Sequence, residues 1–396
     1  MVIESMQDKV IIAGPCSVET PEQLRATVVP LVAGGIKEIR VGIWKPRTRP
    51  GSFEGLGKQA LPWVEALGNE LEVDFTTEVA RPLHVEEALR HNITRFWIGA
   101  RSTTNPFTVQ ELAEAMRGLK VSVMIKNPVN PDPALWIGAV ERMQAMGIED
   151  IRLIHRGFSN YSDTFYRNSP MWQLPISLKT HFPDLPMLCD PSHICGRRDT
   201  LAQVAQMAMD LNFDGLMVET HHQPDAAWSD AVQQLTPEAF FALLKGLRTV
   251  REAVESWEAK KILQGLRDAI DACDRELMEA LLRRQNLAKE VGLLKKKHGV
   301  ALFQRERWKQ VFASRAEWAE AAGLDAAFVQ HMYELIHVHA LKTQEAALQS
   351  GGPPSSPPGS PKNGVKAQLN GKTKDGDQKD SNPDSSPAEG ENPAEE

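Results

Sequence analysis

Hydrophobic and polar positions follow two different patterns along the chain, and the pattern changes near residue 246. Before that point, short apolar runs rich in valine and isoleucine alternate with longer segments, such as 21–35 and 199–212, whose apolar residues have helical spacing. The runs occupy residues 9–17, 36–45, 72–79, 95–100, 121–128, 151–157, 187–193 and 215–220. Apolar strands separated by amphipathic helices are typical of repeated β-α units, in which helices cover both faces of a parallel sheet.

Eight β-α units in roughly 240 residues favour an α/β protein with a closed (β/α)8 TIM barrel, because that fold needs about 250 residues. An open, doubly wound sheet is the alternative. Against it, none of the predicted strand-to-helix turns carries GxGxxG or a P-loop, and polar residues follow nearly every strand instead of gathering at one crevice.

The chain has no proline from residue 250 to 349, and its leucines and alanines recur three and four apart, which predicts an all-α segment. One apolar stripe consists of Leu263, Leu266, Ile270, Cys273, Leu277 and Leu281. The helix that carries it is expected to continue to about Lys297, and a helix of roughly 35 residues needs a partner along its length. Residues 323–348 predict a second long helix, with Asp325 as its N-cap.

The last part of the chain, from Ser350, contains almost no large apolar residue. Such a segment cannot bury enough surface to offset the entropy of ordering it. We therefore expect a barrel over residues 1–248, a helical domain over 249–349 and a disordered tail over 350–396.

Charge and composition narrow the class of ligand. The formal net charge of −7 provides no field that would attract nucleic acid or an anionic membrane, so an anionic ligand must be held by a local cluster of cations. The start MVIESMQDKV lacks the features of a signal peptide, and no stretch approaches the roughly 18 apolar residues of a membrane helix. Four scattered cysteines do not make a disulfide framework. We expect a cytoplasmic protein that acts on small molecules.

The ends of the predicted strands are strongly basic. In a barrel of this kind the carboxyl ends of the strands form the mouth that carries the reactive residues. The cations at or near these ends are Arg40, Lys45, Arg47, Arg101, Lys126 and Arg156. Their mutual repulsion is understandable only if phosphates and carboxylates bind among them.

The same strand ends offer donors for a metal ion. Cys16, His193 and Glu219 follow or end predicted strands, and Asp230 lies just downstream, with Asp225 as the alternative fourth ligand. One sulfur, one nitrogen and two oxygen donors suit Mn, Fe, Co or Zn better than Mg or Ca, which prefer oxygen alone. Such an ion would act as a Lewis acid on an aldehyde oxygen.

The ordered motifs GPCS, KPRT, IGAR and DPSH, followed by VET and SD, resemble the type I DAHP synthases over residues 9–246. This resemblance implies condensation of phosphoenolpyruvate with erythrose 4-phosphate at a divalent ion held by Cys16, His193, Glu219 and Asp230. It places phosphoenolpyruvate against Arg40, Lys45, Arg101, Lys126 and Arg156, and erythrose 4-phosphate against Arg47, Thr48 and Ser102. Lys45 would act near the reacting carbonyl as proton donor or electrostatic partner.

The helical segment has cations of its own. Arg284 and Lys295 are eleven residues apart, which is three helical turns, so both project from one face, with Ala288 and Val291 between them. Arg267 points about a quarter-turn away, toward another surface or a partner's groove.

The run from Leu266 to Lys296, then FQRERW and LKTQ, resembles the all-helical chorismate mutases. This implies that chorismate is bound by Arg267, Arg284, Lys295, Arg305, Glu306 and Gln344, with Arg267 reaching into the other subunit of a homodimer. Cations would hold two carboxylates, and Lys295 and Gln344 would stabilise the breaking ether oxygen. The chain departs from the family in a shorter loop before Arg305, in Leu302 and in Ala340.

Alternatives remain for both parts. The helical domain is either a mutase or a non-catalytic dimerisation or regulatory module, and prephenate or chorismate bound there is a candidate feedback signal to the barrel. For the barrel, the alternative is the related 3-deoxy-octulosonate-8-phosphate synthase, which uses a five-carbon sugar phosphate. KPRT and the mutase-like segment favour the four-carbon substrate.

Overall fold

The structure, a computed structural model, describes residues 6–47, 51–160, 165–250 and 254–349. The chain divides into two compact units, Met1–Ser256 and Trp257–Glu396. The predicted disordered tail over 350–396 and the predicted substrate contact Thr48 lie outside the described residues. None of the helices in the described ranges combines the length and the apolar character that a membrane span requires.

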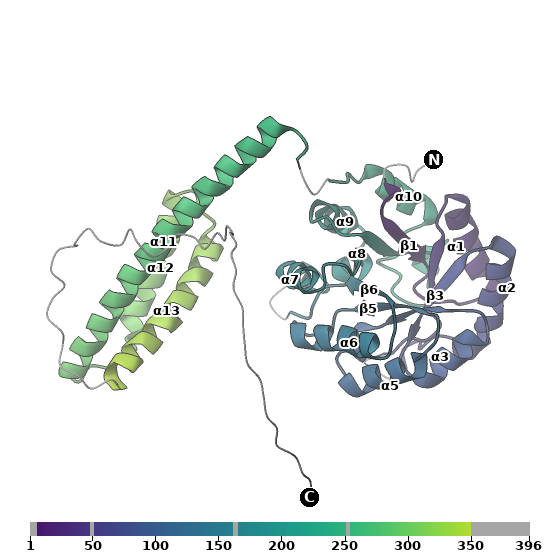
Figure 1. Cartoon of the computed structure of the whole chain (residues 1–396), viewed down its shortest axis with the longest axis horizontal. Coiled ribbons are helices and arrows are strands. Elements are labelled where there is room, and N and C mark those ends of the chain that lie inside the picture. Colours follow the sequence, from purple (N-terminus) through teal and green to yellow (C-terminus); the bar gives the residue numbers. More distant parts are fainter. Residues whose placement is uncertain (1–5, 48–50, 161–164, 251–253, 350–396) are drawn as a thin grey trace, which may run out of the picture. The chain divides into compact units, whose positions relative to one another are not determined.

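The first unit is a closed parallel barrel, which confirms the predicted fold and excludes the open sheet (Figure 1). Its strands are β1 (Val10–Gly14), β2 (Glu38–Val41), β3 (Asp74–Val79), β4 (Arg95–Ile98), β5 (Ser122–Lys126), β6 (Asp150–His155), β7 (Met187–Cys189) and β8 (Gly215–Glu219). The barrel closes because β1 pairs with β8, in a register that sets Val10 opposite Gly215 and Gly14 opposite Glu219. The first and last strands therefore bring their carboxyl ends together.

Helices surround the strands in Figure 1. They are α1 (Pro21–Ala33), η2 (Gly57–Gln59), α2 (Leu61–Leu71), α3 (Pro82–Leu89), α4 (Ala100–Thr103), α5 (Pro106–Met116), α6 (Pro133–Ala145), α7 (Gln173–His181), α8 (Pro191–Cys195), α9 (Leu201–Asp210), η3 (Pro224–Ala226) and α10 (Pro237–Gly246). Local sequence sets several starts: Thr20, Asp132 and Thr236 cap helices α1, α6 and α10, each of which has proline in its first turn.

Strand residues alternate between two apolar clusters, as the two-residue period of a strand requires. The inner cluster consists of Ile12, Trp97, Met124, Ile154, Leu188 and Met217. Their neighbours, such as Ala13 and Val123, join the larger core between strands and helices. The barrel interior is therefore packed, and open space for chemistry lies at the strand ends.

The second unit consists of three helices within the described residues: α11 (Trp257–Lys297), α12 (Arg305–Ala321) and α13 (Ala326–Gln349). Both predicted long helices are present, and the predicted cap is confirmed, since the Phe328 amide donates to Asp325 Oδ1 at 2.6 Å. Helix α13 packs along both α11 and α12. The buried Gly292 of α11 allows the close approach, because an added Cβ would lie 2.9 Å from the Cα of Gln344.

Candidate functional site

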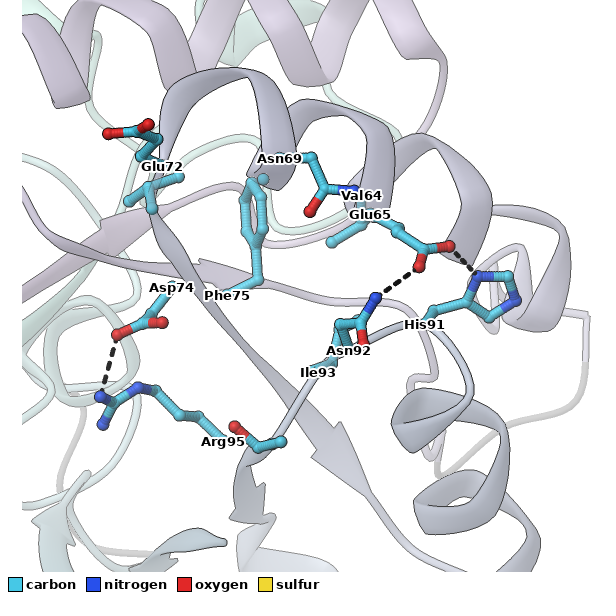
Figure 2. A pocket seen from close by; sticks show the side chains of 13 residues that line it. Val64, Glu65, Asn69, Glu72, Asp74, Phe75, His91, Asn92, Ile93 and Arg95 are labelled. Carbon is cyan, nitrogen blue, oxygen red and sulfur yellow. Dashed lines mark hydrogen bonds and ion pairs between the residues drawn. The ribbon is translucent and has the colours of Figure 1, made fainter.

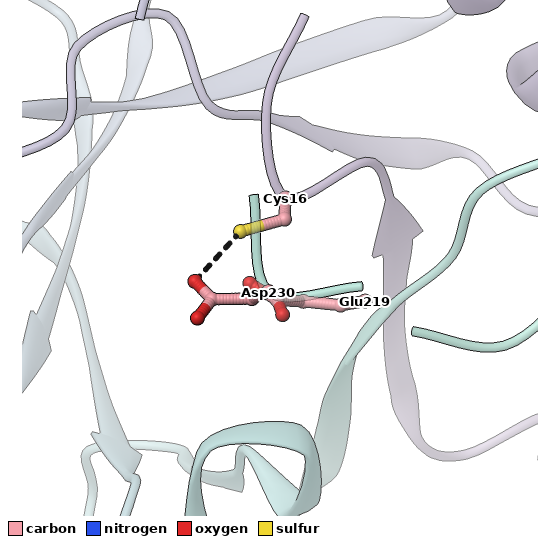
Figure 3. A group of neighbouring side chains, drawn as sticks. All are labelled: Cys16, Glu219 and Asp230. Atoms are coloured by element: carbon pink, nitrogen blue, oxygen red, sulfur yellow. Dashed lines mark hydrogen bonds between the residues drawn. The ribbon is translucent and has the colours of Figure 1, made fainter. Parts of the chain in front are cut away.

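Three of the four predicted metal ligands converge at the mouth of the barrel. Donor atoms of Cys16, Glu219 and Asp230 all lie within 4.8 Å of one another, and Cys16 Sγ donates to Asp230 Oδ2 at 3.2 Å (Figure 3). Cys16 follows β1 and Glu219 ends β8, so the closing strand pair brings them together. Asp230 lies in the loop after β8 with a left-handed backbone, φ 47°, which is unusual for a residue with a side chain.

His193 of α8, the fourth predicted ligand, lies beside this cluster. Its Nε2 is 3.7 Å from Glu219 Oε1, and its Nδ1 is 2.7 Å from Asp190 Oδ2. Burial lowers the pKa of His193, which favours the neutral imidazole that a metal needs. A carboxylate on the far nitrogen is the usual way to orient a histidine ligand.

The donor set fits a divalent cation. Glu219 Oε1 is buried and has no hydrogen-bond partner among the described residues, although Arg40 Nη2 lies 3.0 Å away at ion-pair distance. Burial and the Glu219 carboxylate raise the pKa of the Cys16 thiol to about 12. A thiolate at this position therefore requires additional positive charge nearby, which a bound ion would supply.

Lys45 and Arg47 bring positive charge to the same cluster from the loop after β2. Lys45 Nζ donates to Cys16 Sγ at 2.6 Å and to the Cys16 carbonyl at 2.8 Å. Arg47 Nη1 lies 3.7 Å from Asp230 Oδ2. Lys45 is thus in direct contact with a candidate ligand.

Arg40 and Lys126 lie against Trp97 of the inner barrel. Arg40 is 5.1 Å and Lys126 is 5.6 Å from the Trp97 ring centroid. Arg40 pairs with Glu219, and Lys126 Nζ donates to Asp190 Oδ2 at 2.8 Å. Although burial opposes ionisation of Asp190, His193 and Lys126 hold the pKa of that carboxyl well below its usual range.

Arg156 and Arg101 are two further cations at the ends of β6 and β4. Burial and the charges of Arg167 and Arg101 lower the pKa of the Arg156 guanidinium to about 10. Its Nη1 donates to Asn168 Oδ1 at 2.6 Å. Ser102, next to the exposed Arg101, is buried. Crowding of guanidinium groups disfavours their charged forms, so an anion bound among them would be stabilised.

Two residues that the strand-end argument did not name also belong to this site. Arg167 Nη1 donates to Asp230 Oδ1 at 3.0 Å and to Gln233 Oε1 at 2.7 Å, and Gln233 Nε2 donates to Glu219 Oε2 at 2.6 Å. Both come from loops, the first between β6 and α7 and the second after β8. Neither has a motif or strand position that would have identified it.

The helical unit contains a half-open cavity of about 460 Å³. Arg284, Lys295 and Gln344 line it, together with Leu302 and Ala340. Lys295 Nζ donates to the Leu302 carbonyl at 2.5 Å. Burial lowers the pKa of both Arg284 and Lys295, because a charged group loses hydration when it is partly buried.

Three further predicted contacts lie outside this lining. Arg305, Glu306 and Arg267 are exposed, and Glu306 pairs with Lys309 at 3.1 Å. The cavity is instead lined from α12 by Arg307 and Arg315, which the prediction did not include. Trp308 also lines it and stacks on His337 at 4.0 Å between ring centroids.

Another hollow, of about 320 Å³, lies at the amino ends of β3 and β4, away from the predicted site residues (Figure 2). Its polar groups largely satisfy one another. Glu65 accepts from Asn92 at 2.7 Å and lies 2.7 Å from His91 Nδ1, while Arg95 donates to Asp74 at 2.9 Å. Unlike the barrel mouth with Cys16, this hollow has no cysteine among the residues that line it.

The chain resembles known proteins in both units. Residues 2–256 match the DAHP synthetase I family, and residues 266–345 match chorismate mutase type II. A phospho-2-dehydro-3-deoxyheptonate aldolase of Thermotoga maritima is 31% identical over 244 residues, which are 62% of this chain and 70% of that protein. A 4-amino-4-deoxychorismate mutase of Streptomyces pristinaespiralis is 32% identical over 96 residues, 24% of this chain and 74% of that protein.

A solved structure supports the same relationship. The crystal structure of the Thermotoga maritima aldolase, a DAHP synthase, superimposes with a TM-score of 0.54 at 30% identity, covering 65% of this chain and 70% of that one. The family match spans more than half of the chain and coincides with the barrel whose mouth gathers Cys16, Glu219 and Asp230. The chain therefore belongs to the DAHP synthetase I family, with a chorismate mutase type II domain formed by its C-terminal helices.

Proposed function

We propose that the barrel condenses phosphoenolpyruvate and water with erythrose 4-phosphate, forming 3-deoxy-arabino-heptulosonate 7-phosphate and phosphate, while the helical domain converts chorismate to prephenate. The observation that carries the first reaction is the mixed cluster of Cys16, Glu219 and Asp230 beside a ring of cations. The aromatic pathway requires both activities, which supports their presence in one chain.

Cys16, His193, Glu219 and Asp230 would hold a divalent ion, and the sulfur and nitrogen donors favour Mn, Fe, Co or Zn. When bound, such an ion polarises the aldehyde oxygen of the sugar phosphate. Lys45, in contact with Cys16, stands where it can stabilise or protonate the oxygen formed at the reacting carbonyl. Asp190 holds His193 in the orientation that points Nε2 toward the ligand cluster.

The cations divide between the two substrates. Lys126, Arg156 and Arg101, together with Lys45 and Arg40, would neutralise the carboxylate and phosphate of phosphoenolpyruvate, and the low pKa of Arg156 supports an anion there. Arg47 and Ser102 would contact erythrose 4-phosphate. Thr48, also assigned to this substrate, lies outside the described residues.

In the helical cavity, Arg284 and Lys295 would bind the carboxylates of chorismate, while Lys295 and Gln344 stabilise the ether oxygen as its bond breaks. Arg307 takes the role first given to Arg305, because Arg307 lines the cavity. Glu306 stays a predicted contact that is outside the lining of the single chain, where it pairs with Lys309 at 3.1 Å.

The helical domain is proposed to form a homodimer. The first half of α11 exposes large apolar side chains, among them Leu266, Ile270 and Leu277, which are more than half exposed at 59%, 59% and 51%. A helix with such a stripe needs a partner. Arg267 lies on the same half, where it could enter the cavity of a second copy.

Mixing two variants tests this arrangement. If Arg267 acts in the partner's cavity, inactive Arg267→Ala and Arg284→Ala proteins that exchange subunits should recover roughly a quarter of the wild-type mutase rate, because each mixed dimer regains one intact site. Recovery of no activity, with exchange verified, would show that Arg267 acts in the cavity of its own subunit, together with Arg284 of the same chain.

The barrel reaction is tested by following phosphoenolpyruvate consumption with erythrose 4-phosphate or arabinose 5-phosphate, each with and without EDTA. We expect consumption with the four-carbon sugar and its loss with EDTA. A preference for arabinose 5-phosphate would favour the octulosonate alternative. Loss of chorismate absorbance, measured in parallel, separates a mutase from a non-catalytic module, and adding prephenate to the first assay tests feedback on the barrel.

A further inference from the structure

Two adjacent glutamines, Gln233 and Gln234, lie fully buried behind the ligand cluster. Their segment runs beside the end of β8, where the Leu235 amide donates to the Glu219 carbonyl at 3.0 Å and the His221 amide donates to the Leu235 carbonyl at 2.8 Å. These backbone hydrogen bonds hold the side chains of Gln233 and Gln234 next to Glu219. The two glutamines come only three and four residues after Asp230.

Gln233 donates a hydrogen bond to Glu219 and is linked to Asp230 by Arg167. Its Nε2 donates to Glu219 Oε2 at 2.6 Å, and its Oε1 accepts from Arg167 at 2.7 Å, the guanidinium nitrogen that also donates to Asp230 Oδ1 at 3.0 Å. The orientation of the amide is determined by its neighbours, since an ionised carboxylate can only accept and a guanidinium can only donate.

The hydrogen bond to Oε2 leaves the other oxygen of Glu219 for an ion. Oε1 is the atom that faces the candidate ligand His193, at 3.7 Å from Nε2. It accepts no hydrogen bond from the described residues, and its ion-pair partner is Arg40 Nη2 at 3.0 Å. A carboxylate free to rotate about its last bond would not keep one oxygen in this position. Gln233 on Oε2 and Arg40 beside Oε1 therefore fix together which oxygen of Glu219 faces His193, and Gln233 is the one that does so by a hydrogen bond.

Gln234 forms hydrogen bonds with the backbone of the two segments that carry Cys16 and Asp230. Its Oε1 accepts from the Cys16 amide at 3.0 Å, and its Nε2 donates to the carbonyl of Ser229 at 2.9 Å, directly before Asp230. The pair of amides thus joins the loops that carry Cys16, Glu219 and Asp230.

The geometry points to Gln233 as a positioning residue for the metal centre, which orients Glu219 directly and Asp230 through Arg167. This inference rests on the proposed metal function. Outer hydrogen-bond partners of metal ligands commonly contribute roughly 10- to 100-fold to metal affinity. A residue that merely fills space would contribute to folding but not to the affinity or the coordination spectrum.

The test uses the full-length chain, stripped of metal and titrated with cobalt(II), in wild type and in Gln233→Met, which keeps the length and removes both hydrogen bonds. Dissociation constants come from competition with a chelator, and the thiolate-to-cobalt and d–d absorption bands report coordination. We expect cobalt affinity to fall roughly 10- to 100-fold, with a changed d–d band. The rate constant kcat for phosphoenolpyruvate consumption should fall more than KM rises.

Gln233→Asn is the second variant, because it keeps a polar amide but is one methylene too short to reach both partners, and it should give the same shifts. Gln206→Met is the matched control, since Gln206 of α9 is half-buried and bonds to Asp210 and to the backbone of Arg248, and it should leave cobalt binding unchanged. Wild-type cobalt affinity and spectrum in a folded Gln233 variant would overturn the positioning role alone. A wild-type chain that binds no cobalt would overturn the metal centre itself.

Discussion

Replacing Gly292 by alanine should both loosen the helical domain and slow the mutase, because the added methyl has no space. The new Cβ would lie 2.9, 3.0 and 3.1 Å from the Cα, Cβ and Cγ of Gln344. Carbon atoms in good contact are about 3.5–4.0 Å apart, so α11 and α13 must separate by about 0.5–1 Å at this point. That separation moves Gln344, one of the side chains that line the cavity.

The expected magnitudes combine two opposing effects. Alanine in place of a mid-helix glycine favours the helix by about 1 kcal/mol, whereas overpacking a well-packed contact costs about 1–3 kcal/mol. The free energy of unfolding should therefore fall by up to about 2 kcal/mol. Displacing a catalytic group by 1 Å can lower the rate by about 100-fold, so we expect a loss of at least about tenfold in kcat for chorismate.

Gly265→Ala provides the matched control, because Gly265 lies in the same helix and no atom of its own chain lies within 4 Å of an added Cβ. It should raise the melting temperature of the helical domain by about 4–8 °C, measured by calorimetry on the full chain, and leave chorismate turnover unchanged. If Gly292→Ala stabilises the domain as much as the control and keeps the wild-type rate, then either the close helix contact or the role of Gln344 is wrong.

Two other predictions concern charge. Arg307→Ala should lower kcat/KM for chorismate roughly 10- to 100-fold, as expected for one lost charge-assisted hydrogen bond. Arg305→Ala should change kcat/KM little, because Arg305 does not line the cavity. A larger loss in Arg305→Ala than in Arg307→Ala would contradict this assignment. Burial, with the charge of Arg156, lowers the pKa of His155 to about 3. Below about pH 6.5, His155 binds a proton in the unfolded chain but stays neutral in the folded barrel. The free energy of unfolding should therefore be highest above that pH and be about 2 kcal/mol lower at pH 5. His155→Leu should flatten this acid slope in denaturant titrations, and an unchanged slope would assign it to other groups.

The barrel and its central cluster could be predicted from the sequence because eight β-α units, with polar residues after nearly every strand, favour a closed barrel over an open sheet. Once eight parallel strands close, the first and last are neighbours, and Cys16 after β1 must lie near Glu219 at the end of β8. Arg167, Gln233 and Gln234 were not predicted, because loop residues are placed by tertiary contacts that have no period in the sequence.

The helical cavity shows how a small offset along a helix changes which residue lines it. Arg305 and Arg307 are two positions apart, so at about 100° per residue their side chains point to nearly opposite sides of α12. The motif FQRERW contains both, and the pattern of the chain does not determine where the helix begins after the loop from α11. In the structure α12 begins at Arg305, and the face that carries Arg307, Val311 and Arg315 lines the cavity. The phase of the helix, set by the preceding loop and by packing against α13, therefore determines which of the two arginines lines the cavity, and this is the reason why we propose the role for Arg307.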